Sequence, residues 1–136
     1  MPQKVSYILL ADDDPEDREM FVDRFHLYRP TVPVECLDSG YAVLDWLEKC
    51  SPDQLPDLIL VDYKMHGMTG AEVLRTIQHD ERFLHVPKIV WSTSNNSKYI
   101  DECLQNGARK YFTKPSDMQE FDKMINYLGH LVDTGN

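Results

Sequence analysis

The sequence is poor in the residues that mark a metal–thiolate site or a membrane segment. Its three cysteines, Cys36, Cys50 and Cys103, are an odd number without the spacing of zinc ligands. Cys36 and Cys103 lie among apolar residues, so we expect small core side chains in a reducing compartment. No apolar stretch is long enough to cross a bilayer, and no signal peptide precedes the first strand pattern. We therefore expect a cytoplasmic protein.

Basic residues are also scarce. There are 14 lysines and arginines against 23 acidic residues, which gives a net charge of −9, and no basic patch is apparent. Phosphate contacts to nucleic acid and binding to an anionic membrane both require clustered positive charge. We therefore predict no nucleic-acid and no membrane partner, and we interpret the acidity as a property of a soluble surface.

The sequence contains no internal repeat, low-complexity segment or linker. Its 136 residues, 42% of them hydrophobic and 27% charged, are enough for one domain with its own core. We predict a single domain over residues 1–136 with no output domain. Its ordered core should cover residues 5–128, and residues 129–136 should fray.

Five short apolar runs alternate with five segments that have helical periodicity. The expected strands cover residues 7–11, 32–37, 58–61, 88–91 and 110–113, and the expected helices cover 15–28, 39–49, 70–77, 97–106 and 117–128. Asp14 before Pro15 predicts a helix start, and Gly107 predicts a helix end capped by a residue in the left-handed backbone conformation. Phe21, Phe25 and Tyr28 should give the first helix one apolar face. Such alternation indicates an α/β fold with a parallel sheet covered on both faces.

Polar side chains follow four of the five expected strands. Asp12 and Asp13 follow the first strand, Asp62 ends the third, Ser92 ends the fourth and Lys114 follows the fifth. The carboxyl ends of parallel strands meet at one edge of a sheet, where ligands bind. We therefore expect carboxylates, a hydroxyl and an ammonium group to converge on one crevice.

These residue types together suit phosphoryl transfer. Clustered carboxylates repel one another unless a cation lies between them, and a few carboxylates with water suit Mg²⁺. A carboxylate such as Asp62 can attack phosphorus, while the metal and Lys114 neutralise the charge of the phosphoryl group. Ser92 can donate a hydrogen bond to a phosphoryl oxygen.

In this arrangement the chain resembles a receiver domain of a two-component response regulator. It is most similar to stand-alone receivers such as the chemotaxis receiver and small phytochrome-associated receivers. The resemblance implies a flavodoxin-like, doubly wound (βα)5 fold with strand order 2-1-3-4-5. It is carried by Asp12-Asp13, Asp62-Tyr63-Lys64-Met65, Gly70, Ser92, Tyr111 and Lys114-Pro115.

The resemblance also implies specific roles at this site. Asp62 would accept a phosphoryl group from a histidine kinase or a histidine phosphotransfer protein. Mg²⁺ would be held by Asp13, Asp62 and the backbone carbonyl of Lys64, and by Asp12 through water. Lys114 would pair first with Asp62 and then with the phosphoryl group. The domain would assist its own phosphorylation and dephosphorylation without being an enzyme.

A second implied set of residues transmits and tunes the signal. Ser92 and Tyr111 would be the switch pair, and Lys64 and Ser94 would tune the lifetime of the aspartyl phosphate. The output surface would comprise the fourth helix, fifth strand and fifth helix. Binding of a protein target and relay of the phosphoryl group both remain open, as does a homodimer.

The sequence departs from the family next to Asp62. Receivers usually carry proline four residues after the phosphoacceptor, and this chain has His66. A solvent-facing loop residue is one interpretation, and a metal ligand or a donor to the phosphoryl group is the other. The family also implies a cis bond between Lys114 and Pro115.

Other interpretations compete with a receiver. Asp12 and Asp14 have the spacing of the two acids of a haloacid-dehalogenase-type phosphatase, although Glu16 does not match that motif. A degenerate receiver that only scaffolds a complex is a further alternative. More simply, the first acids could cap a helix, Asp62 and Lys114 could form a structural ion pair, and Tyr111 could pack in a strand.

Overall fold

The computed structural model describes residues 6–134 as an α/β fold around one parallel sheet, and the side chain of residue 134 is not described. The sheet has five strands in the order β2-β1-β3-β4-β5, which is the order that the resemblance to receiver domains implied. The elements are β1 (Ile8–Ala11), α1 (Pro15–Tyr28), β2 (Val34–Leu37), α2 (Gly40–Lys49), η1 (Pro52–Gln54), β3 (Leu58–Asp62), α3 (Gly70–Ile77), η2 (Glu81–Phe83), β4 (Lys88–Ser92), α4 (Ser97–Gln105), β5 (Lys110–Thr113) and α5 (Met118–Thr134).

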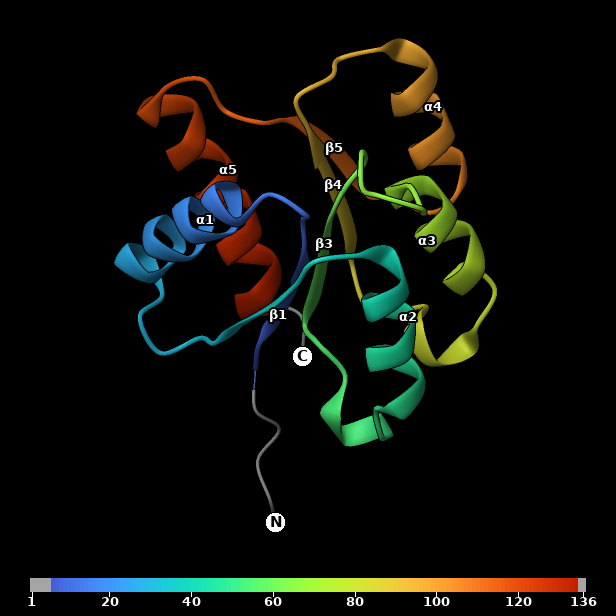
Figure 1. Ribbon diagram of the computed structural model, residues 1–136. Coiled ribbons are helices and arrows are strands. Elements are labelled where there is room, and N and C mark those ends of the chain that lie inside the picture. The colour runs from blue at the N-terminus through green and yellow to red at the C-terminus, as the bar shows by residue number, and fades with distance from the viewer. Residues whose placement is uncertain (1–5, 135–136) are drawn as a thin grey trace.

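Helices cover both faces of the sheet. Helices α1 and α5 lie on one face, and α2, α3 and α4 lie on the other (Figure 1). The central strands β1, β3 and β4 are buried along their whole length, which explains why their sequences read as continuous apolar runs. Successive side chains alternate between two core layers: Ile8 packs in the layer beneath α1 and α5, and Leu9 packs in the layer beneath α2, α3 and α4.

Side chains of the connecting loops fix the helix starts. Asp14 accepts a hydrogen bond from the backbone of Glu16 at 2.9 Å and begins α1, as predicted. Thr69 and Glu72 form a reciprocal capping box at the start of α3. Gly107 follows α4 with a φ of +100°, which agrees with the left-handed end expected there.

The start of α3 lies unusually close to the end of β3. The backbone nitrogen of Gly70 donates to the carbonyl oxygen of Tyr63 at 2.9 Å. A Cβ atom at Gly70 would lie 2.6 Å from the carbonyl oxygen of Asp62, inside the contact limit. Glycine at this position therefore lets the helix reach the strand end that carries Asp62.

The predicted fraying of residues 129–136 is wrong for residues 129–134, which continue α5. Val132 is only 4% exposed and packs in the core layer beneath α1 and α5. Asp133 forms a 2.5 Å ion pair with Arg29, which follows α1. These contacts stabilise the last helical turns, and residues 135–136 lie outside the described part of the chain.

Three smaller expectations also need correction. Strand β2 begins at Val34, because the preceding Pro33 has no backbone N–H to donate to a sheet. Tyr28 is 39% exposed and does not continue the buried face of Phe21 and Phe25. Cys36 is half-buried, whereas Cys103 is buried as expected. Among the described helices, none combines the length and apolar character needed to cross a membrane.

Candidate functional site

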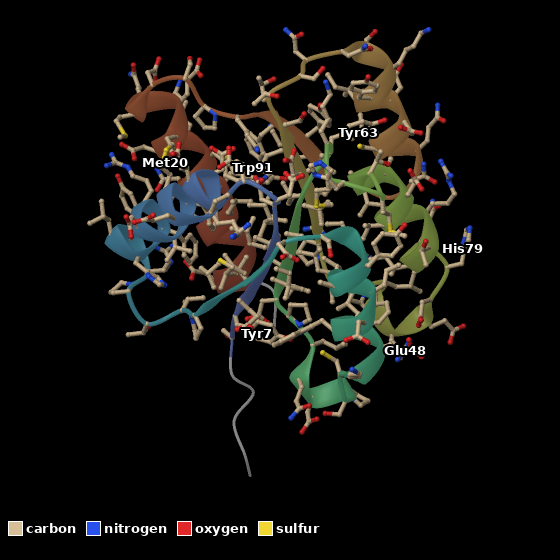
Figure 2. All side chains as sticks on the ribbon, viewed as in Figure 1. Tyr7, Met20, Glu48, Tyr63, His79 and Trp91 are labelled. Atoms are coloured by element: carbon tan, nitrogen blue, oxygen red, sulfur yellow. The ribbon has the colours of Figure 1, made fainter. Side chains whose placement is uncertain are left out.

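Three carboxylates meet at the carboxyl edge of the sheet. Asp12 and Asp13 directly follow β1, Asp62 ends the adjacent β3, and one oxygen from each lies within 4.8 Å of the others. Asp12 is fully buried and Asp62 is 4% exposed, whereas Asp13 is partly exposed. Tyr63 and Trp91 lie toward this edge, and Tyr7 lies toward the opposite edge (Figure 2). The convergence of the three carboxylates, expected from the sequence, is therefore present.

The ammonium group of Lys114 neutralises part of this negative charge. Its Nζ atom lies 2.8 Å from Oδ2 of Asp12 and 3.2 Å from Oδ2 of Asp62. It also lies 2.7 Å from Oδ2 of Asp17, and 4.9 Å from the ring centre of Trp91. A single cation is thus shared by three carboxylates.

Asp17, the third partner of Lys114, is not among the site residues predicted from the sequence. It lies in the first turn of α1, immediately after the acidic segment that follows β1. That proximity to the carboxyl edge was the available signal. The pairing itself depends on the position of Lys114, which is 97 residues away.

Burial and like charge oppose ionisation of Asp62. Burial and the neighbouring Asp12 raise the pKa of Asp62 to about 7, although Lys114 acts in the opposite direction. Burial would lower the pKa of Lys114, but the ion pairs with Asp12 and Asp17 and the charge of Asp62 raise it above its usual value. The pocket therefore holds more negative charge than its one ammonium group balances.

The expected cis bond between Lys114 and Pro115 is wrong, because every peptide bond among the described residues is trans. Trans is the lower-energy form of an X–Pro bond by roughly 0.5–1 kcal/mol. The backbone nitrogen of Lys114 donates to the carbonyl oxygen of Ser92 at 2.6 Å. This bond and the three carboxylates hold the lysine without a cis peptide.

The two proposed switch residues contact the same loop. Ser92 is fully buried at the end of β4, and its Oγ accepts from the backbone nitrogen of Ser94 at 3.1 Å. The hydroxyl of Tyr111, on the neighbouring β5, donates to the carbonyl oxygen of Ser94 at 2.6 Å. Burial raises the pKa of Tyr111. The β4–α4 loop is therefore held by both side chains.

A second connection to α4 begins at the residue after Asp62. The Tyr63 hydroxyl donates to Oε1 of Glu102 at 2.6 Å, and its ring stacks on Tyr99 with centres 4.2 Å apart. The exposed side chain of Lys64 reaches over the Tyr99 ring at 5.7 Å, and its backbone nitrogen donates to Oδ1 of Asp62 at 3.3 Å. The sequence reasoning did not anticipate this network.

His66 is a solvent-facing loop residue that also contacts the carboxylate cluster. Its side chain is 99% exposed, as expected for a solvent-facing loop residue. Its Nδ1 atom nevertheless lies 2.9 Å from Oδ2 of Asp13, and its backbone nitrogen donates to the same oxygen at 3.3 Å. The residue thus contacts one member of the carboxylate cluster.

The donor set fits a small divalent cation. Asp12, Asp13 and Asp62 supply only oxygen atoms, which hard cations prefer, and two of the three carboxylates are buried beside each other. A divalent cation would offset the repulsion that Lys114 leaves uncompensated. The Asp12/Asp13/Asp62 cluster is compatible with Mg²⁺.

Comparison with protein families matches residues 8–126 to the response regulator receiver domain. The chain is a response regulator receiver domain. This result and the strand order confirm the family and the flavodoxin-like fold predicted from the sequence. The phosphatase alternative receives no support.

Curated relatives of this receiver domain include two-component response regulators of plants. ARR3 of Arabidopsis thaliana is 34% identical over 129 residues, which cover 90% of this chain and 55% of ARR3. ARR6 of the same species is 32% identical, covering 93% of this chain and 71% of ARR6. ORR12 of Oryza sativa subsp. japonica is 29% identical, covering 90% of this chain and 97% of ORR12. The chain thus spans about half of ARR3 and nearly all of ORR12.

Solved structures with the same fold include bacterial receivers. The phosphorylated cyanobacterial phytochrome response regulator RcpA has a TM-score of 0.83 at 22% identity, covering 99% of this chain and 97% of RcpA. The Mn²⁺-bound form of response regulator Rcp1 has a TM-score of 0.71 at 25% identity, covering 93% of this chain and 91% of Rcp1. Receiver domains are signalling domains that interact with histidine kinases or phosphotransfer proteins.

Proposed function

We propose that this receiver domain accepts a phosphoryl group on Asp62, in a Mg²⁺-dependent reaction with a phosphohistidine of a histidine kinase or a phosphotransfer protein. One observation carries the proposal: Asp62 is a buried carboxylate, at the end of a central strand, with Lys114 and two further carboxylates around it. The pairing of a nucleophilic carboxylate with a cation-binding cluster is the arrangement that phosphoryl transfer requires.

In the proposed step, a carboxylate oxygen of Asp62 attacks the phosphorus atom of the phosphohistidine. The P–N bond breaks, its electron pair stays on the imidazole nitrogen, and the product on Asp62 is an acyl phosphate. Asp13, Asp62 and the backbone carbonyl of Lys64 would hold the cation directly, and Asp12 would hold it through water; a bound cation would neutralise charge on the phosphoryl oxygens.

Lys114 is placed to contact the negative charge both before and after phosphorylation, first on the Asp62 carboxylate and then on the phosphoryl oxygens. Its contact with Asp62 is the longest of its three carboxylate contacts, and Asp12 and Asp17 hold it from the other side. Phosphorylation turns the Asp62 carboxylate into an acyl group and adds phosphoryl oxygens. Lys114 would then exchange the carboxylate for a phosphoryl oxygen without leaving its other two partners.

The proposed output runs through Ser92 and Tyr111. The buried Ser92 hydroxyl would turn toward a phosphoryl oxygen, which removes its bond with the backbone of Ser94. Because Tyr111 holds the carbonyl of Ser94, it would move with the same loop. Phosphorylation would thereby shift the populations of two arrangements of the face formed by α4, β5 and α5. Lys64 and Ser94 would tune the lifetime of the acyl phosphate.

A labelling experiment tests the phosphoacceptor. Wild type and Asp62→Asn are incubated with Mg²⁺ and ³²P-labelled acetyl phosphate, and base-labile protein-bound phosphate is measured. We expect label on wild type, none on Asp62→Asn, and none on wild type in EDTA. Asp53→Asn, which alters an exposed acid in η1, serves as the matched control and should label like wild type. Normal labelling of Asp62→Asn would refute the proposal.

The same labelling experiment, with Asp12→Asn added, also tests the phosphatase alternative. A phosphatase that used Asp12 as its nucleophile would lose labelling in Asp12→Asn and keep it in Asp62→Asn. The fully buried Asp12, whose Oδ1 accepts from the backbone of Asp14 at 2.9 Å, favours a supporting role instead. We expect Asp12→Asn to need more Mg²⁺ for labelling, with the label still on Asp62.

A further inference from the structure

His66 makes two contacts with one oxygen atom of Asp13. The ring nitrogen Nδ1 lies 2.9 Å from Oδ2, and the backbone nitrogen donates to the same atom at 3.3 Å. The neutral imidazole can donate from Nδ1 in one of its two tautomers. A single carboxylate oxygen is therefore held by two N–H groups of one residue.

The loop that carries His66 is held from a second side. Gly67 has a φ of +80°, a conformation that residues with a side chain rarely adopt, and a Cβ atom there would lie 2.9 Å from the ring of Tyr41. The Tyr41 hydroxyl, on α2, approaches the carbonyl oxygen of Gly67 at 3.4 Å. The loop thus lies between α2 and the turn after β1. These contacts on two sides fix the position of His66 relative to Asp13.

Asp13 has more freedom than its two neighbours. Asp12 and Asp62 are buried and contact Lys114, whereas the Asp13 side chain is 28% exposed and, among the described residues, forms no ion pair with a lysine or arginine. A carboxylate that can rotate must lose that freedom to coordinate a cation. Groups that hydrogen-bond to a ligating carboxylate fix its orientation and contribute to metal affinity.

We propose that His66 is a positioning residue, which holds Oδ2 of Asp13 through Nδ1 and thereby orients this carboxylate for the divalent cation. The role is indirect, because Nδ1 faces the carboxylate oxygen. This inference rests on the cation site of the proposed function. It assigns a role to His66, which stands where receivers usually carry proline. A proline at this position could supply neither a side-chain donor nor a backbone donor.

Four substitutions separate the two contacts. Asn places its amide nitrogen where His places Nδ1, Gln moves the amide outward, Ala keeps only the backbone donor, and Pro removes both donors. Binding of Mn²⁺ is followed by the loss of the free-ion electron paramagnetic resonance signal, and Mg²⁺ affinity is obtained by competition. We expect His66→Ala and His66→Gln to bind the cation about tenfold more weakly, the lower end of such effects, because the side chain is exposed.

The affinities of His66→Asn and His66→Pro should lie above and below that of His66→Ala. His66→Asn should restore affinity to within about twofold of wild type, and His66→Pro should bind more weakly than His66→Ala. Wild-type affinity in His66→Ala, or equal affinity in His66→Asn and His66→Gln, would overturn the proposal. His79→Ala, an exposed histidine beyond α3 (Figure 2), is the matched control and should bind like wild type.

A double mutant shows whether the effect passes through Asp13. In an Asp13→Asn background, His66→Ala should cause no further loss of affinity, and an additive loss would contradict the proposal. Labelling of Asp62 at saturating Mg²⁺ is measured on the same proteins. Unlabelled wild type with His66-dependent binding would refute only the proposed function, whereas full labelling with His66-independent binding would refute only this inference.

Discussion

Asp62 shows how a functional side chain can oppose stability. It is buried beside Asp12, and the pKa of its carboxyl is raised to about 7, so its charged form is disfavoured in the fold. Under the proposed function, Asp62 needs its charged form for chemistry, so the protein retains this residue at a cost to folding. Such strain is common where a site is organised for a ligand that relieves it.

Replacing Asp62 with Asn should therefore stabilise the metal-free protein. The amide removes the repulsion with Asp12, while Lys114 keeps its contacts with Asp12 and Asp17. We expect an increase of about 1 kcal/mol in the free energy of unfolding, measured by urea denaturation in EDTA. Added Mg²⁺ should stabilise wild type more than the variant, because binding to the folded state adds stability. A less stable Asp62→Asn would show that the ion pair with Lys114 dominates.

At the scale of elements, α4 is joined to the site through Tyr63. This residue directly follows β3, and its hydroxyl bonds to Glu102 in the middle of α4. Burial and the Glu102 carboxylate raise the pKa of Tyr63, so the phenol keeps its proton as the donor. Helix α4 is therefore connected to the end of β3 through Tyr63.

Tyr63→Phe tests this connection. Loss of the hydrogen bond to a charged acceptor should lower the free energy of unfolding by about 1–2 kcal/mol and should speed amide hydrogen exchange in α4. Tyr99→Phe retains the ring stacking and is the matched control, for which we expect less than about 0.5 kcal/mol. Equal hydrogen exchange in wild type and Tyr63→Phe would show that the bond does not hold the helix.

Helix α4 also carries the buried Cys103, whose thiol should make the free energy of unfolding depend on pH. Burial raises the pKa of Cys103 to about 12, so the folded state keeps this proton at a pH where the unfolded state loses it. The unfolded state then binds fewer protons, and stability must fall as pH rises above the ordinary thiol pKa. Between about pH 8 and pH 10 we expect wild type to lose roughly 1–2 kcal/mol more than Cys103→Ala, measured by urea denaturation. Parallel losses would contradict this assignment.

At the scale of the whole molecule, the last turns of α5 close the structure against α1. Val132 is buried, and Asp133 pairs with Arg29 just beyond the end of α1. Deleting residues 129–136 should cost at least about 2 kcal/mol of unfolding free energy, mostly through Val132. Val132→Ala should account for about 1–2 kcal/mol, whereas Asp133→Asn should cost less than about 0.5 kcal/mol because its ion pair is exposed. A deletion without effect on thermal denaturation would contradict this view.

The sequence predicted those parts of the molecule that follow from local patterns. Apolar runs located the strands, and polar residues at strand ends located the carboxyl edge, because both signals lie within a few residues. The pairing of Asp17 with Lys114 and the contact of His66 with Asp13 join distant segments. The helical turns around Val132 were missed because their stability comes from packing against α1, which local propensity does not contain.

Gly70 has a consequence for how this receiver domain can vary. A Cβ atom at this position would meet the backbone of Asp62 and Tyr63, so a side chain there must displace main-chain atoms instead of a flexible side chain. In a saturation-mutagenesis library, position 70 should be depleted of all nineteen alternatives even when selection acts on folded protein alone. Lys64, exposed and six residues earlier, should tolerate most of them. Variation can therefore alter the exposed side chains of this segment, while the path of its backbone next to Asp62 stays fixed.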